Sequence, residues 1–260
     1  MATMLKLDHI TKKFGGLVAV NDLCMEVKEH EIHALIGPNG AGKTTATNMI
    51  EGVYPPTSGH IYFMDKEITN MQTYQIARLG IGRTFQNIKV YNTMTALENV
   101  MVGGHQLTKL DLFPSILRPF KLRQEEKMLR EKAEHMLDYI GLYSIRNELV
   151  KNLPYGNRKV LEIGRALMTD PKLILLDEPA AGLNPSERAD FIRLVLRIYD
   201  EGKTLFFIEH NMDVVMNVSQ MITVVNFGAK IAEGTPREIQ NDPEVIKAYL
   251  GERFKVANNG

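Results

Sequence analysis

The sequence has no net charge, a single cysteine and no long apolar run. Lys and Arg together number 31, as do Asp and Glu, so no global field attracts nucleic acid or anionic lipid. Cys24 has no disulfide partner within the chain, which is typical of a reducing compartment. No stretch approaches the roughly 20 apolar residues that cross a bilayer, and no apolar segment follows the charged start, so we expect no signal peptide. We therefore expect no nucleic-acid partner, and any role at a membrane must depend on another protein.

The 260 residues are enough for one large domain with a sizeable core. Short β-like runs alternate with longer helical runs, which predicts a mainly parallel sheet covered by helices. The expected strands are residues 5–10, 18–27, 31–36, 61–63, 173–176 and 205–208, the first two in an antiparallel layer. The expected helices are 42–51, one opening at 95–98, 124–140, one opening at 184–185, and two short helices within 235–250.

Residues from about 91 to 160 differ from the rest because helical patterns dominate them. Thr95 and Glu98 form a capping-box pattern, residues 103–122 are irregular, and apolar residues recur at helical spacing in 124–140. We expect one α/β domain over residues 1–260. Residues 1–90 and 161–260 would form its nucleotide-binding core, with an N-terminal antiparallel β layer, and about 91–160 would form an inserted α-helical subdomain.

A glycine-rich loop between the expected strand 31–36 and the expected helix 42–51 carries the strongest motif. It matches G-x-x-x-x-G-K-[ST] in full and consists of Gly37, Pro38, Asn39, Gly40, Ala41, Gly42, Lys43 and Thr44. Glycines let successive backbone N–H groups face inward around phosphates, at the positive end of the following helix. Lys43 would reach the β- and γ-phosphates, and the Thr44 hydroxyl would bind Mg²⁺. The loop therefore predicts a site for ATP or a related nucleotide.

A second motif fits the first. The apolar run 173–176 ends in Asp177 and Glu178. Asp177 is placed to hold the water shell of Mg²⁺, and Glu178 can polarise an attacking water as general base. These two motifs predict a P-loop nucleotide hydrolase but leave its kind open. The alternatives are a GTPase, for which the base-reading motif N-K-x-D is absent, a small-molecule kinase, and a cassette protein that acts on ribosomes or DNA.

Further motifs resemble those of the ABC (ATP-binding cassette) ATPase family over nearly the whole chain. They are the Q-loop at 83–86 (RTFQ), the signature segment at 153–157 (LPYGN), the D-loop at 181–184 (AGLN) and a histidine at 210. The resemblance implies that Gln86 touches Mg²⁺ and the attacking water, that His210 contacts the γ-phosphate, and that Phe14 stacks on adenine. It extends the nucleotide-binding loop to Thr45.

The signature segment departs from the family pattern L-S-G-G-Q. Its residues are Leu153, Pro154, Tyr155, Gly156 and Asn157, so the serine hydroxyl and the first glycine of the pattern are replaced. Gly156 and the free N–H groups at the start of the following helix, expected at residues 157–159, can still bind anionic oxygens. The D-loop ends in Asn184 where Asp is usual. We expect this segment to bind its share of ATP more weakly unless a sister subunit carries a better one.

Within the family, the chain resembles the ATP-binding subunits of branched-chain amino acid importers. The segments 81–86, 153–156 (LPYG), 180–185 and 248–252, together with the long insert 103–122, carry this narrower resemblance. It implies membrane-spanning permease subunits, a second and different ATPase, an indirect solute-binding partner, and a peripheral place at the cytoplasmic face of the membrane. Urea or amide importers and a lipopolysaccharide exporter are related alternatives, and the chain itself cannot reveal the solute.

Overall fold

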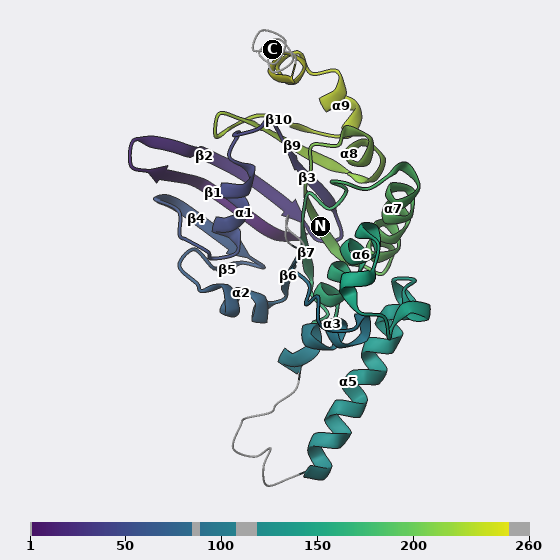
Figure 1. Cartoon of the computed structure of the whole chain (residues 1–260). Coiled ribbons are helices and arrows are strands. Elements are labelled where there is room, and N and C mark those ends of the chain that lie inside the picture. The colour runs from purple at the N-terminus through teal and green to yellow at the C-terminus, as the bar shows by residue number, and fades with distance from the viewer. Residues whose placement is uncertain (1, 85–88, 108–118, 250–260) are drawn as a thin grey trace.

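The computed structural model describes residues 2–84, 89–107 and 119–249, which form two sheets and their covering helices (Figure 1). The smaller sheet has four antiparallel strands in the order β2-β1-β4-β5. Its strands are β1 (Thr3–Phe14), β2 (Leu17–Lys28), β4 (Ser58–Phe63) and β5 (Lys66–Glu67). The predicted N-terminal antiparallel layer is therefore confirmed.

The larger sheet has six strands in the order β10-β9-β3-β8-β7-β6, and each pair is parallel except β9 with β10. Its strands are β3 (Ile32–Ile36), β6 (Ile81–Arg83), β7 (Leu173–Asp177), β8 (Thr204–Ile208), β9 (Met221–Asn226) and β10 (Ala229–Gly234). Strands β3, β7 and β8 are buried at every position, as expected of parallel strands covered on both faces. The predicted α/β class with a mainly parallel core sheet is confirmed.

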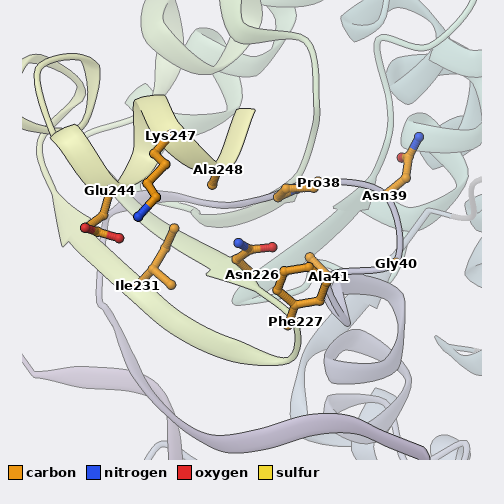
Figure 2. Close-up of a pocket in the computed structure, with 10 residues that line it drawn as sticks. All are labelled: Pro38, Asn39, Gly40, Ala41, Asn226, Phe227, Ile231, Glu244, Lys247 and Ala248. Atoms are coloured by element: carbon orange, nitrogen blue, oxygen red, sulfur yellow. The ribbon is translucent and has the colours of Figure 1, made fainter. Parts of the chain in front are cut away.

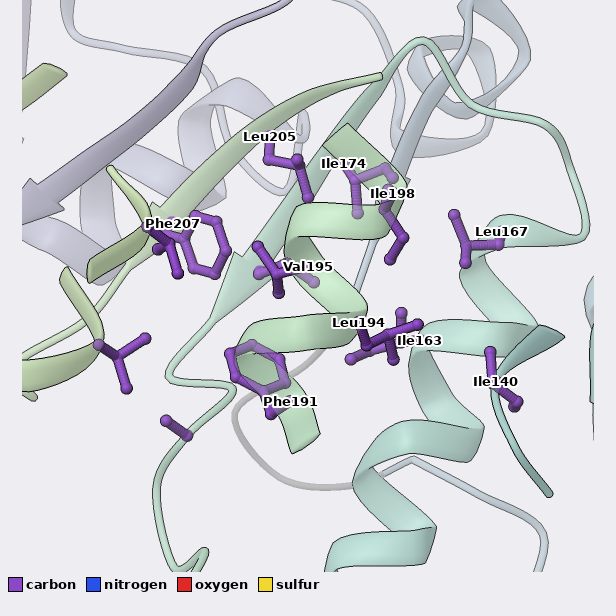
Figure 3. Close-up of a cluster of buried hydrophobic side chains, with 14 of the residues drawn as sticks. Ile140, Ile163, Leu167, Ile174, Phe191, Leu194, Val195, Ile198, Leu205 and Phe207 are labelled. Atoms are coloured by element: carbon purple, nitrogen blue, oxygen red, sulfur yellow. The ribbon is translucent and has the colours of Figure 1, made fainter. Parts of the chain in front are cut away.

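Alternate residues of the central strands supply two separate hydrophobic cores. Ile174, Leu205 and Phe207 join the core formed with the helices α6 (Tyr155–Leu167) and α7 (Pro185–Asp200) (Figure 3). Leu175 and Phe206 face the other way, into the core shared with the antiparallel sheet and the helix α1 (Lys43–Ile50). The period of two along each strand thus fixes the layers, and the carboxyl ends of β3, β7 and β8 meet at one edge.

The remaining helical segments lie between residues 73 and 152 and between 212 and 240. They are α2 (Thr73–Leu79), α3 (Ala96–Gly103), η1 (Gly104–Leu107), α5 (Pro119–Tyr139), η2 (Tyr143–Ile145), η3 (Val150–Asn152), α8 (Met212–Val218) and α9 (Pro236–Gln240). A further helical run covers 243–249, so both predicted short C-terminal helices are present. No helix in the described ranges is long and apolar enough to cross a membrane.

Predicted helix starts are confirmed at two positions and shifted at two. Thr95 and Asn184 cap α3 and α7 through reciprocal bonds with the Glu three residues later. Helix α5 begins at Pro119 rather than near residue 124, and most of the insert 103–122 lies outside the described residues. Helix α6 begins at Tyr155 because Pro154 supplies an extended N-cap, so the predicted start at residue 157 is wrong by two residues.

The helices α3, α5 and α6 pack together at one end of the large sheet (Figure 1). Their buried side chains, such as Val100, Leu137 and Leu161, belong to the same core as Ile174 and Leu176 of β7. The division of the chain into a core and a subdomain at residues 91–160 remains a prediction.

Candidate functional site

The glycine-rich loop runs from the end of β3 into α1, and three of its glycines have positive φ. A Cβ added to Gly37 would lie 2.1 Å from the Val225 carbonyl oxygen, and one added to Gly42 would lie 2.4 Å from that of Ala19. These distances are far below contact, so the loop can pack against β9 and β2 only without side chains. Gly40 has open space around it, and its φ of 77° is the reason a glycine is favoured there.

Lys43 occupies the centre of this loop. Its side chain is 7% exposed, and its Nζ donates to the carbonyls of Gly37 at 2.7 Å and Pro38 at 2.9 Å. Thr44 is exposed and Thr45 half-buried in the first turn of α1, whose leading N–H groups lack partners within the helix. The ammonium and these dipoles make the loop a site for an anion with several oxygens.

Asp177 is the last residue of β7 and is 2% exposed. Its Oδ2 accepts from Arg83 Nη2 at 3.2 Å, while its buried Oδ1 has no hydrogen-bond partner among the described residues. Burial raises the pKa of the Asp177 carboxyl, and the Arg83 guanidinium beside it acts in the opposite direction. A buried carboxylate oxygen with nothing bonded to it fits a cation.

Arg83 is a site residue to which the sequence analysis assigned no role of its own. It ends β6, next to β7, and pairs with both Asp177 and the buried carboxylate of Glu51. Glu51 caps the C-terminal end of α1, the helix that follows the phosphate-binding loop. Arg83 therefore connects the loop's helix to the acidic end of β7. The order of β6 and β7 in the sheet, which the sequence does not state, creates this contact.

Glu178 follows Asp177 in a left-handed conformation with φ of 46°. Its N–H donates to the Ile208 carbonyl at 2.8 Å, and its carbonyl accepts from Lys159 Nζ at 2.8 Å. The Glu178 carboxylate is 18% exposed and lies 3.5 Å from His210 Nδ1. The structure thus brings together the two side chains predicted as general base and γ-phosphate contact.

Glu209 is a second site residue that the sequence analysis missed. It is 1% exposed, and its Oε1 accepts from the N–H of Ala180 at 2.8 Å. Its Oε2 accepts from the N–H groups of His210 and Asn211, both at 3.1 Å. Glu209 therefore joins the start of the D-loop to the backbone that carries His210. In the sequence, Glu209 stands between the end of the expected strand 205–208 and His210, and this position could have marked it as a candidate site residue.

The signature segment forms the N-terminal end of α6. Leu153 is buried, Pro154 is the N-cap, and the Tyr155 side chain is 44% exposed. Gly156 is buried, and a Cβ there would lie 2.5 Å from Glu187 Oε1 on α7. Asn157 is half-buried. Because the helix begins at Tyr155, its leading N–H groups belong to residues 155–157.

Phe14 lies at the end of β1 with its ring 45% exposed. The ring meets Tyr54 edge-on with 5.5 Å between centroids, and Lys12 Nζ lies over both rings. The Tyr54 hydroxyl accepts from Asn48 Nδ2 on α1 at 3.3 Å. Phe14 is therefore an accessible aromatic face that Tyr54 ties to the loop's helix, and stacking on adenine remains a prediction.

Gln86 lies outside the described residues, so its assigned role also remains a prediction. The N–H of Thr84, two residues before it, donates to the Leu175 carbonyl at 3.0 Å. This hydrogen bond extends the pairing of β6 with β7 by one residue beyond Arg83. The segment resumes at Lys89, whose N–H donates to the buried carboxylate of Glu162 on α6 at 3.2 Å.

A cavity of about 620 Å³ is lined in part by residues 38–41 of the phosphate-binding loop (Figure 2). The end of β9 with the turn after it, β10 and the C-terminal helical run form the rest of its wall. Its lining residues are Pro38, Asn39, Gly40, Ala41, Asn226, Phe227, Ile231, Glu244, Lys247 and Ala248. Neither Lys43 nor Asp177 nor Glu178 is among them. The groups predicted to act in catalysis therefore lie outside the lining of this cavity, near the carboxyl ends of β3, β7 and β8.

Two family models match the sequence. The model described as ABC transporter matches residues 20–181, and the model described as branched-chain amino acid ATP-binding cassette transporter matches residues 229–255. The first match covers more than half of the 260 residues and contains both the phosphate-binding loop and the acidic end of β7.

Curated relatives align along nearly the whole chain. LivG of Salmonella typhimurium, a high-affinity branched-chain amino acid transport ATP-binding protein, is 43% identical over 250 residues. BraF of Pseudomonas aeruginosa, with the same description, is 42% identical. Each alignment covers 96% of this chain and 98% of the relative.

Solved structures agree with these matches. An ATP-binding cassette of an ABC transporter in its ADP conformation has a TM-score of 0.84 at 34% identity, covering 96% of this chain and all of the other. A nucleotide-free cassette has a TM-score of 0.83 at 35% identity, covering 95% and 98%. The first family match includes the loop before Lys43 and the acidic end of β7. The chain belongs to the family of ABC transporter ATP-binding subunits and is an ATPase.

Proposed function

We propose that the chain hydrolyses ATP to power an importer of branched-chain amino acids. The observation that carries the solute class is the match of residues 229–255 to a family described by that transport, since the ATPase core alone is common to the whole family. The relatives described as branched-chain amino acid transport proteins support it along 96% of the chain.

In the proposed site, Lys43 and the N–H groups of the loop hold the phosphates, and Phe14 stacks on adenine. Thr44, Asp177 and Gln86 would hold Mg²⁺, which Asp177 Oδ1 fits because it is buried without a hydrogen-bond partner. Mg²⁺ in such sites takes few protein ligands and keeps waters and phosphate oxygens. Bound Mg²⁺ would neutralise charge on the phosphate oxygens.

Glu178 acts as the general base in this proposal. Its carboxylate accepts a proton from water, the water oxygen bonds to the γ-phosphorus, and the bond from that phosphorus to the bridging oxygen of ADP breaks. His210, 3.5 Å from the Glu178 carboxylate, contacts the γ-phosphate and fixes the direction of that carboxylate. The partly buried position of Glu178 limits competition from bulk water.

The second half of each ATP site comes from another cassette. The signature segment 153–157 of one chain would cover the ATP held by residues 37–45 of the other. Pro154 has no hydroxyl for a γ-phosphate oxygen, so this contact relies on Gly156 and on the leading N–H groups of α6. In a homodimer both sites would use this weaker segment, whereas a second, different ATPase would improve one. A heterodimer is therefore the proposed assembly.

Permease subunits would dock beside the Q-loop, at the cytoplasmic face of the membrane. Our placement on residues 87–102 rests on Tyr91, which is 50% exposed, and on Val90 and Met94, which are partly buried. Ile88 lies outside the described residues. A neighbouring cavity of about 300 Å³ lies between α2, β6 and α6, with Val53, Ile76 and Gly103 among its lining residues. A short apolar helix of a permease fits this region, and the solute-binding protein acts only through the permease.

Assembly with partners should raise the ATPase rate strongly. The purified chain should turn over ATP slowly and dimerise poorly, and addition of a sister ATPase and permease subunits in vesicles should give ATP-dependent leucine uptake. ATP turnover, dimer mass and uptake of labelled leucine measure these outcomes. Full unstimulated activity as a homodimer would contradict the heterodimer, and uptake of urea instead of leucine would contradict the solute class.

Pro154→Ser should strengthen ATP-driven closure of the dimer or raise the hydrolysis rate. The serine regains one hydrogen bond to a charged phosphate oxygen, worth roughly 1.5–3 kcal/mol where the geometry allows it. ATP turnover and the ATP concentration at half-maximal rate in the assembled complex measure the change. Ser at an N-cap also favours α6, so Pro154→Ala serves as the control without a hydroxyl. An unchanged or lower rate would show that this segment is adapted to proline.

A further inference from the structure

The backbone at Glu178 is held from two sides. Its N–H donates to the end of β8 at Ile208, and its carbonyl accepts from Lys159 Nζ of α6, both at 2.8 Å. Ala180, two residues on, is fixed through its N–H by the buried Glu209 carboxylate. These contacts surround a non-glycine residue with φ of 46°, a conformation that needs support from its neighbours.

Lys159 is an unusual lysine for its surroundings. It is 4% exposed although lysine is rarely fully buried, and its Nζ lies 5.8 Å from the centre of the Tyr155 ring. Four acidic side chains act on it electrostatically: Glu162, Glu209, Glu178 and Asp177. The Lys159 ammonium therefore lies among these carboxylates. It donates its hydrogen bond to the main-chain carbonyl of Glu178, the residue proposed as general base.

The hydrogen bond from Lys159 links Glu178 to the helix that begins in the signature segment. Lys159 lies on α6 shortly after the signature segment, whose exposed Pro154 and Tyr155 begin that helix. Because a helix is stiff over one turn, a shift of α6 would move Lys159 and, through this hydrogen bond, the carbonyl of Glu178.

We propose that Lys159 is a positioning residue that aims the Glu178 carboxylate and ties it to the signature helix of the same chain. This proposal rests on the proposed role of Glu178 as general base. Lys159 touches neither nucleotide nor water in this proposal. Its hydrogen bond keeps residue 178 in the left-handed conformation, and its charge stabilises the ionised carboxylates around it.

Lys159→Met tests the proposal because methionine has a similar length but neither charge nor donor. In the assembled complex, kcat should fall about tenfold or more, while the dissociation constant for ATP stays within about twofold. Lys159→Arg, which retains a charged donor, should recover part of the rate. Lys127→Met, on the exposed side of α5, controls for removal of a lysine charge from the helical region. Thermal unfolding of each variant shows whether the fold is kept.

Comparing Lys159→Met in the wild type and in Glu178→Gln separates a role of Lys159 in positioning Glu178 from a role in packing alone. If Lys159 acts through Glu178, Lys159→Met should slow the residual hydrolysis of Glu178→Gln by less than about twofold. An equal slowing in both backgrounds, or normal kcat for Lys159→Met beside a slow Glu178→Gln, would overturn the positioning role and leave the base assignment intact. Fast hydrolysis by Glu178→Gln would overturn the base assignment, and the positioning role with it. Lys159→Gln provides a second neutral variant if Lys159→Met does not fold.

Discussion

Glu178→Gln is expected to abolish steady-state ATP hydrolysis while leaving ATP binding intact. Loss of a general base typically costs 10²- to 10⁴-fold in rate. Gln keeps the size of the side chain at a position where the backbone has φ of 46° and is hydrogen-bonded on both sides. The phosphate contacts proposed for Lys43 and the α1 N-terminal amides should be unaffected. Trapped in the ATP state, the variant should also accumulate as a closed dimer.

Phosphate release, ATP binding and dimer mass measure these outcomes. Glu67→Gln, at an exposed carboxylate of β5, is a matched control that should hydrolyse ATP at the wild-type rate. Near-normal hydrolysis by Glu178→Gln would show that another group takes the proton. Loss of ATP binding instead would place Glu178 in the binding machinery.

The sequence predicted those parts of the site whose residues lie next to one another in the chain. The loop 37–44 and the pair Asp177 and Glu178 each follow a buried strand, so local patterns were enough to place them. The structure adds that both lie at the same edge of the sheet, because parallel strands present their carboxyl ends together. The resemblance supplied His210, and the structure places it 3.5 Å from Glu178.

The contacts that support the site depend on the order of the strands, and the sequence does not contain that order. Arg83 reaches Asp177 because β6 is the neighbour of β7, and Glu209 reaches Ala180 because β8 lies on the other side. Lys159 reaches Glu178 through packing of α6 near the same edge. Glu209 and Lys159 are buried and Arg83 is half-buried, and each lies in a segment whose sequence is typical of an ordinary helix or strand end.

The missed and shifted elements have local causes. Strands β9 and β10 form a hairpin in which β10 is only partly buried, so its apolar pattern is weak. Helix α6 begins with Tyr155 and Gly156, which are poor helix formers, so the sequence delays the apparent start. Gly156 nevertheless packs closely there, because a Cβ at this position would displace the side chain of Glu187.

Lys43→Ala is expected to remove most of the affinity for ATP itself. Each hydrogen bond from an ammonium to a charged oxygen is worth roughly 1.5–3 kcal/mol, so its loss weakens binding by about 10- to 100-fold or more. The effect should exceed that of a surface charge because Lys43 is 7% exposed and little screened by water. A direct binding titration with ATP measures the loss. Hydrolysis should fall in parallel at ATP concentrations that saturate the wild type.

Lys43 also donates to the carbonyls of Gly37 and Pro38, so Lys43→Ala could loosen the loop as well as remove a charge. The response to ligand separates the two effects. A ligand present at 100 times its dissociation constant stabilises the folded state by about 2.7 kcal/mol, so ATP should raise the unfolding temperature of the wild type. For Lys43→Ala the unfolding temperature without ATP should stay near that of the wild type, while the rise with ATP should be nearly absent. Lys13→Ala, at an exposed lysine of β1, is the control that should keep the full rise. A normal rise for Lys43→Ala would mean that the phosphates bind elsewhere than in the loop 37–45.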